Sequence, residues 1–258
     1  MQVFLAVTPG ELAEAMPFSR SFAHVAYRIG EESALLRQSL LLQARGGLLA
    51  VSDRGAPPIG DPEKLCAAVL RECGRRSYGG VLLDFEEPPR PDRLAFVRRL
   101  GQILSASRRA LYLPEAWAEA APTGAALICT AISGGNFTER LREAADRRGA
   151  GRLALDVQRL RMDFRLPART GEGLPLTASE FQTLLDRERP AVFFSQDLCA
   201  RYFTYTLEGD THFVLFDDAD TMTQKMNTAA GMGFSTAFLM YPEVRDLLPK
   251  LFPGKAGP

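Results

Sequence analysis

The chain has 258 residues, of which 46% are hydrophobic and 24% are charged, a composition typical of a globular protein with a large core. Lys and Arg together number 31, as do Asp and Glu, so the formal net charge is zero. We therefore expect neither nucleic acid nor an anionic membrane as a partner, because both select an excess of basic residues. The length suits a single α/β barrel domain, which commonly has about 250 residues.

Short β-rich runs alternate with helical patterns along the chain, which predicts a parallel sheet. The strands are expected at 3–7, 22–27, 48–52, from Gly80 onward, and at 110–113, 126–132, 152–157 and 235–240. Helices are expected at 31–44, 62–74, from Pro91 onward, from 137 to about 146, and at 220–230 and 243–252. The dipeptides Asp61-Pro62 and Pro91-Asp92 are typical helix starts.

A longer connection separates the seventh and eighth expected strands. It contains a helical pattern at 179–187, an apolar run at 191–195 and a hairpin with arms at 202–206 and 212–216. We expect these segments to form a small α+β insertion at about 176–218. Eight strand–helix units with one insertion predict an α/β protein with a (β/α)8 TIM barrel, and residues 1–258 as a single domain.

Several site types have no support in the sequence. Cys66, Cys73, Cys129 and Cys199 lack metal-binding spacing, and no nucleotide-binding glycine loop is found, so we expect no metal and no cofactor. No apolar run is long enough to span a bilayer, and the start of the chain has no signal-peptide pattern. We expect a protein that stays in the cell, unless a leader is missing from this chain.

The fourth strand carries the most informative residues. A glycine pair and an apolar run lead to Asp84 and Glu86, which share one face because side chains on a strand alternate. Two carboxyls at the end of a buried strand are costly unless they meet water, each other or a ligand. Parallel α/β folds bind ligands at that end of the strand. The alternative is a strand that runs into a solvated acidic loop.

Residues 79–86 resemble the signature of the family 18 (chitinase-like) glycoside hydrolases, Asp-Gly-x-Asp-x-Asp-x-Glu. Gly80, Asp84 and Glu86 match it, while Gly79 and Leu82 replace its two earlier aspartates. The run 22–27 is similar to the family's second strand, and 202–234 to its late insertion and last helix and strand. The resemblance is closest to the spore-associated and cell-wall branch of the Firmicutes, which also implies a possible place in the spore.

This resemblance implies a hydrolase that acts on polymers containing N-acetylglucosamine, with peptidoglycan favoured over chitin. Glu86 would be the proton donor, and Asp84 would raise the pKa of Glu86 and then hold the acetamido group of the sugar. The acetamido oxygen itself would attack the anomeric carbon with retention, so no enzyme nucleophile is needed.

Further residues are expected to line the substrate groove at the barrel mouth. They are Tyr27, Tyr112, Glu115, Asp156, Met240 and Tyr241. The sixth strand of active members ends in a Tyr-Asp pair that is missing at 131–134, so one of the three tyrosines would have to replace its hydroxyl. Met240 stands where the family has a tryptophan under the sugar. Glu115 as a solvated loop acid, and Asp156 paired with Arg159 or Arg161, are the structural alternatives.

Two other functions remain open. The missing signature residues are compatible with a catalytically inactive barrel that binds carbohydrate or a protein partner in a spore or envelope assembly. An unrelated barrel enzyme could use Glu86 and Glu115 as an acid/base pair. The sequence does not predict the oligomeric state.

Overall fold

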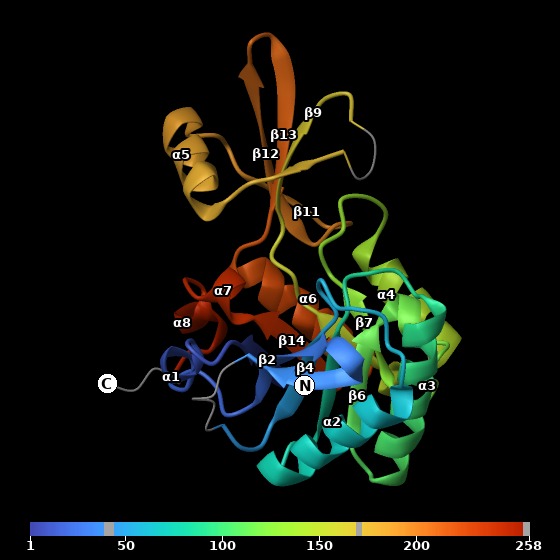
Figure 1. Ribbon diagram of the computed structural model, residues 1–258. Helices are drawn as coiled ribbons and strands as arrows, with labels where there is room; N and C mark the ends of the chain where they lie inside the picture. Colours follow the sequence, from blue (N-terminus) through green and yellow to red (C-terminus); the bar gives the residue numbers. More distant parts are fainter. Residues whose placement is uncertain (39–43, 169–171, 255–258) are drawn as a thin grey trace.

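The computed structural model describes residues 1–38, 44–168 and 172–254, and its centre is a closed barrel of eight parallel strands (Figure 1). In chain order the barrel strands are β1 (Gln2–Val7), β2 (Phe22–Gly30), β4 (Leu48–Ser52), β5 (Gly80–Asp84), β6 (Ala110–Pro114), β7 (Ala125–Cys129), β8 (Leu153–Asp156) and β14 (Thr236–Met240). Pairing of β1 with both β2 and β14 closes the ring. The predicted (β/α)8 barrel is thus confirmed.

Helices pack around the barrel and connect its strands. The long ones are α2 (Pro62–Arg76), α3 (Pro91–Ala106), α4 (Phe137–Arg148) and α6 (Ala219–Gly231). The short ones are α1 (Leu12–Ala15), α7 (Tyr241–Val244), α8 (Leu248–Leu251) and the 3-10 turns η1 (Glu31–Ser33), η2 (Glu115–Trp117) and η3 (Ala150–Arg152). Asp61 caps α2 as expected, accepting a 2.9 Å hydrogen bond from the Lys64 amide. Asp218 caps α6, accepting a 2.9 Å hydrogen bond from the Thr221 amide.

The helix expected at 31–44 is wrong for the part that the structure describes. After η1 the chain turns back as β3 (Ala34–Arg37), which pairs antiparallel with β2. Glu32 and Ser33 have positive φ angles of 51° and 57°, which a continuing helix does not allow. Residues 39–43 of the expected helix lie outside the described residues. Pairing with a neighbouring strand has overridden local helical preference here.

The closing helix expected at 243–252 is instead two short helices, α7 and α8. Pro249 lies in the second of them and has no amide hydrogen to donate to an earlier carbonyl. A single continuous helix across this segment would lose that hydrogen bond. No helix in the described ranges combines the length and apolar character needed to cross a membrane.

The long connection between β8 and β14 forms a second sheet. Its strands are β9 (Arg161–Arg165), β10 (Leu174–Pro175), β11 (Phe193–Ser195), β12 (Ala200–Leu207) and β13 (Asp210–Phe216), in the order β10-β9-β13-β12-β11. Helix α5 (Ala178–Glu188) lies beside this sheet, and the whole unit projects from one end of the barrel (Figure 1). The sheet begins at Arg161, earlier than the expected boundary at 176, because β9 pairs with β13.

A buried ion pair joins the insertion to the barrel. Asp217 follows β13, and its carboxylate accepts two 2.8 Å hydrogen bonds from the ammonium of Lys225 on α6. Both side chains are fully buried. Asp217 also bonds Leu160, where the chain enters the insertion: its amide donates to the Leu160 carbonyl and its carboxylate accepts from the Leu160 amide. Both connections to the insertion are therefore fixed at one point.

The barrel interior is apolar below its mouth. Phe4 stacks on Phe238 with ring centroids 5.4 Å apart, and Tyr112 meets Phe238 edge-on at 4.9 Å. Small residues such as Ala23 and Ala50 leave room for these rings. Residues on the alternate positions of the strands face outward and pack against the helices. This alternation decides which side chains reach the mouth.

Candidate active site

A cavity of about 590 Å³ lies at the mouth of the barrel, at the carboxyl ends of the strands. Its lining residues are Ala6, Leu82, Leu83, Asp84, Phe85, Glu86, Pro114, Glu115, Leu127, Cys129, Arg140, Asp156, Gln158, Phe238 and Met240. The apolar members come mainly from the barrel interior, and the acidic ones from the last residues of the strands or just beyond. Barrel enzymes carry their active sites at this end.

Alternation along β5 brings Asp84 to the cavity. Leu82, two residues earlier, packs in the barrel interior, whereas Leu83 and Phe85 belong to the outer core. Phe85 is held there by Trp117, whose ring meets it edge-on at 5.3 Å. Asp84 is half-buried, and Glu86, just past the end of the strand, is exposed. Both carboxyls line the same cavity.

The loop that carries Glu86 is fixed by a buried ion pair that sequence reasoning missed. Asp53, which follows β4, accepts a 2.9 Å hydrogen bond from the Glu86 amide. Its other carboxylate oxygen lies 3.3 Å from Nη1 of Arg93 on α3, and both side chains are 0% exposed. Arg93 also donates to the Ala56 carbonyl at 3.1 Å. The sequence did contain a signal for Asp53, because it directly follows the apolar run 48–52. Asp84 was selected by the same criterion, an acid at the end of a buried strand.

The electrostatics of the cavity centre on Asp84. Burial raises the pKa of Asp84 to about 6, and the negative charges of Glu86, Asp156 and Asp53 add to the shift. Burial also raises the pKa of Asp156, while a 2.7 Å hydrogen bond from Gln158 opposes that rise. The sequence led us to expect a raised pKa for Glu86. In the structure Asp84, the more buried acid of the two, is itself a group with a raised pKa.

Glu115 and Asp156 both line the cavity, each with its own partner. Glu115 is bonded by two arginines, Arg140 at 2.9 Å and Arg147 at 3.2 Å. Both oxygens of this carboxylate are thus occupied by guanidinium groups, which weighs against an acid/base pair of Glu86 and Glu115. Asp156 is bonded by Gln158 rather than by the arginines considered from the sequence. Met240 lies in the wall of the cavity, where it was expected.

The three tyrosines expected at the mouth do not line this cavity. Tyr27 faces outward, where its hydroxyl bonds Glu72 at 2.9 Å and Tyr78 at 3.1 Å. A shift of register between Val25 and Tyr27, where β2 pairs with β4, turns its side chain away from the interior that Val25 faces.

The other two tyrosines are placed by their hydroxyl partners. Tyr112 lies inside the barrel, but its hydroxyl is 3.5 Å from Oγ1 of Thr236, the first residue of β14, and so points toward the opposite end. Tyr241 is buried beside β1 and donates a 3.0 Å hydrogen bond to Glu14. All three predictions of a mouth-lining hydroxyl are therefore corrected by the positions of the side chains.

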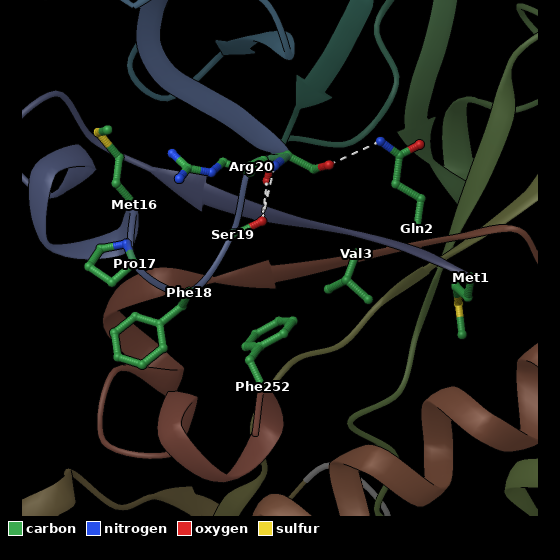
Figure 2. A pocket seen from close by; sticks show the side chains of 10 residues that line it. Met1, Gln2, Val3, Met16, Pro17, Phe18, Ser19, Arg20 and Phe252 are labelled. Carbon is green, nitrogen blue, oxygen red and sulfur yellow. Dashed lines mark hydrogen bonds between the residues drawn. The ribbon is translucent and has the colours of Figure 1, made fainter. Parts of the chain in front are cut away.

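A second cavity, of about 520 Å³, lies at the amino ends of the strands (Figure 2). It is bounded by the start of β1, the segment before β2 and Phe252 (Figure 2). The side chain of Gln2 donates a 3.1 Å hydrogen bond to the Ser21 hydroxyl. None of its described lining residues carries a carboxylate. The acidic cavity at the other end is therefore the candidate site. Within the described ranges, no three His, Cys, Asp or Glu side chains are arranged to hold a metal ion.

Comparisons with known proteins agree on the fold. No protein-family profile matches the chain, and no curated protein matches it significantly by sequence. Among solved structures, a chitinase from Chromobacterium violaceum is 16% identical, with a TM-score of 0.68 and coverage of 100% of this chain and 99% of that chain. The spore cortex-lytic enzyme SleL of Bacillus megaterium is 13% identical, with a TM-score of 0.67 and coverage of 97% and 74%.

A third similar structure is a GH18 chitinase mutant from Cycas revoluta, 10% identical, with a TM-score of 0.67 and full coverage of both chains. At these identities the likeness concerns the fold. The chain has the barrel fold of the family 18 glycoside hydrolases, as its sequence motifs led us to expect.

Proposed function

We propose that this chain, which has the family 18 barrel, hydrolyses glycans that contain N-acetylglucosamine, with Glu86 as the proton donor. The observation that carries the proposal is the shared position of Asp84, Glu86 and Asp156 in one cavity at the barrel mouth. Glu86 is exposed and can reach a bound glycan, while Asp84 lies deeper in the same cavity. An exposed position suits a proton donor, and a deeper one suits a carboxylate that stabilises the developing positive charge.

The proposed reaction uses the substrate's own acetamido group. Its carbonyl oxygen attacks the anomeric carbon while Glu86 gives a proton to the departing glycosidic oxygen. Asp84, when ionised, accepts a hydrogen bond from the acetamido N–H and stabilises the positive charge that develops on the ring formed. Glu86 then takes a proton from water, which attacks the anomeric carbon and gives the product with retained configuration.

The similar structures support the choice of substrate class. The Cycas revoluta chitinase was solved in complex with (GlcNAc)4, so a barrel of this shape holds N-acetylglucosamine oligomers. The SleL enzyme is described as spore cortex-lytic, which favours a cell-wall glycan. Together with the motifs in 79–86 and 202–234, this likeness makes peptidoglycan our first choice of polymer and chitin the second.

A second candidate function, a barrel that binds glycan or protein without cleaving it, is favoured by one observation. Among the described residues no tyrosine lines the cavity, so the tyrosine hydroxyl that holds the acetamido group in active family members has no counterpart in this part of the chain. The cavity floor, with Leu82, Leu127 and Phe238, offers no replacement donor. Loss of one such donor typically lowers the rate by ~10²–10³.

Release of reducing sugar from N-acetylglucosamine oligomers and from peptidoglycan separates the two functions. We expect release by the natural chain, and a loss of at least ~10² for Glu86→Gln if Glu86 is the general acid. Glu119→Gln is the matched control, because Glu119 is 96% exposed and outside the cavity. Equal rates for Glu86→Gln and the natural chain would remove the first proposal. Glycan binding without release by the natural chain would establish the second.

A further inference from the structure

One cluster of side chains at the cavity rim carries a positive charge. Arg140 and Arg147 both lie on α4, and each bonds a different oxygen of Glu115, at 2.9 Å and 3.2 Å. Two guanidinium groups thus share one carboxylate, and the three side chains keep one net positive charge. No other residue that lines this cavity is basic. Among the described residues that line this cavity, Arg140 is thus the one basic side chain.

The two arginines of the cluster differ in their access to the cavity. Arg140 lines it, its side chain is 37% exposed, and its charge opposes the rise in pKa that burial causes for the Cys129 thiol in the same cavity. Arg147 is 65% exposed and does not line the cavity. Arg140 is thus the member that can reach a ligand.

The insertion fixes the start of the helix that carries Arg140. Asn136 caps α4, accepting a 3.0 Å hydrogen bond from the Glu139 amide. Asp197, in the insertion, accepts from the Asn136 side chain at 2.9 Å and, through its backbone carbonyl, from the Phe137 amide at 2.7 Å. Arg140 lies one turn further along the helix. The start of the helix is therefore fixed by the cap, and the guanidinium of Arg140 is held by Glu115.

The cavity is lined by one arginine and four acids, of which only Glu115 is paired with that arginine, and this affects which glycans can bind. Asp84, Glu86 and Asp156 make the cavity repel anions, so a glycan with carboxyl groups can enter only if a cation receives them. A neutral glycan needs no such group. A guanidinium matches the two oxygens of a carboxylate and binds them as a pair of hydrogen bonds.

We propose that Arg140 determines specificity by binding a carboxylate of the substrate, so that the site prefers N-acetylglucosamine glycans that carry carboxyl groups over neutral ones. This inference rests on the proposed function, because it assumes that the cavity binds a glycan. It concerns the choice among glycans, and not the proton transfer itself.

The test compares two forms of one glycan. The probe is a tetrasaccharide in which N-acetylglucosamine alternates with N-acetylmuramic acid, without peptides, and the second form has its carboxyl groups reduced to alcohols. Binding to the natural chain is measured by calorimetry, with neutral N-acetylglucosamine tetramer as a third ligand. We expect the acidic form to bind at least about tenfold more tightly than its reduced form, the factor that ~1.4 kcal/mol represents.

Variants of the two arginines then assign the preference. Arg140→Gln should abolish the difference between the acidic and reduced forms, and Arg140→Lys, which keeps the charge but not the paired geometry, should restore part of it. Arg147→Gln is the comparison variant: it removes the other bond to Glu115 and lowers the net charge of the cluster to zero, but it leaves the guanidinium that lines the cavity, so it should reduce the difference less than Arg140→Gln does. Thermal unfolding of each variant shows whether α4 has stayed folded.

Each remaining outcome overturns the inference. Equal binding of the acidic and reduced forms by the natural chain rejects it and leaves the proposed function standing. A preference that survives in Arg140→Gln, or that is lost equally in Arg147→Gln, assigns the effect to other residues. Binding of none of the three glycans rejects both this inference and the proposed function.

Discussion

The amide of Glu86 donates a 2.9 Å hydrogen bond to the carboxylate of Asp53, a residue 33 positions earlier in the chain. Asp53 is in turn paired with Arg93, and both side chains are fully buried. The position of the proposed proton donor thus depends on an ion pair beneath it. This arrangement leads to the first prediction.

Replacement of Asp53 by alanine should both destabilise the protein and displace Glu86. The change leaves the Arg93 charge buried without its main partner, which typically costs about 3–5 kcal/mol of unfolding free energy. Urea unfolding measures that loss, and sugar release measures the effect on Glu86. The matched control is Asp61→Ala, which removes only a helix cap and should cost about 1 kcal/mol. A loss at Asp53 no larger than that of the control would contradict the prediction.

The dependence of activity on pH should follow Asp84. Its pKa is raised to about 6, and the proposed reaction needs its ionised form. The rate should therefore fall by about tenfold for each unit of pH below that value, as protonation removes the carboxylate. A profile of kcat/KM against pH measures this. An acid limb that begins only near the ordinary aspartate pKa would show that Asp84 is not the group that titrates.

Ionisation of Asp84, which the proposed reaction needs, should lower the free energy of unfolding. Because the folded-state pKa of about 6 lies above the ordinary value of 3.8, ionised Asp84 opposes folding. That cost is absent below pH 3.8 and complete once the pH has risen past about 6. Asp84→Asn should thus stabilise the fold by about 1–3 kcal/mol at neutral pH, and by little in acid. Urea unfolding at both pH values provides the comparison.

Tyr27→Phe should reduce stability without changing glycan binding. The hydroxyl bonds Glu72 and Tyr78 outside the barrel, and its removal leaves a partly buried carboxylate with one partner fewer. A loss of about 1–3 kcal/mol is expected for such a group. A role for Tyr27 at the mouth predicts weaker binding of N-acetylglucosamine oligomers instead, so calorimetry with the variant decides between the two positions.

The sequence predicted the barrel because its strand signals are local. Each buried strand is a short apolar run bounded by turn residues, and Asp61 and Pro62 set the start of α2 where they were expected. The segment at 31–37 was wrong because an exposed strand edge on β2 was available to pair with it, which no local pattern reveals. Strand β9 was missed for the same reason, since its partner β13 lies some 50 residues further along the chain.

The site was predictable at the carboxyl ends of the strands, where Glu86 and Glu115 also reach the cavity from just beyond a strand. Asp84, Asp156 and Met240 lie on strands, and simple alternation brings them to the cavity. Tyr27 failed because a register shift reverses its side chain, and Tyr112 because its hydroxyl points down the barrel. Arg140 had no sequence signal at all. Its place depends on how α4 is docked, which is a property of the tertiary structure.

The bonds that Asp197 and Asp217 make have a consequence for any attempt to shorten the chain. The insertion between β8 and β14 projects from the barrel, and its replacement by a short linker would be the obvious way to shorten the protein. Its removal would take away the partner of the Asn136 side chain and the acceptor of the Phe137 amide, and would leave Lys225 as an unpaired charge under the barrel wall. The insertion therefore stabilises α4 and α6, which lie on either side of it, and a shortened version of this protein has to retain it.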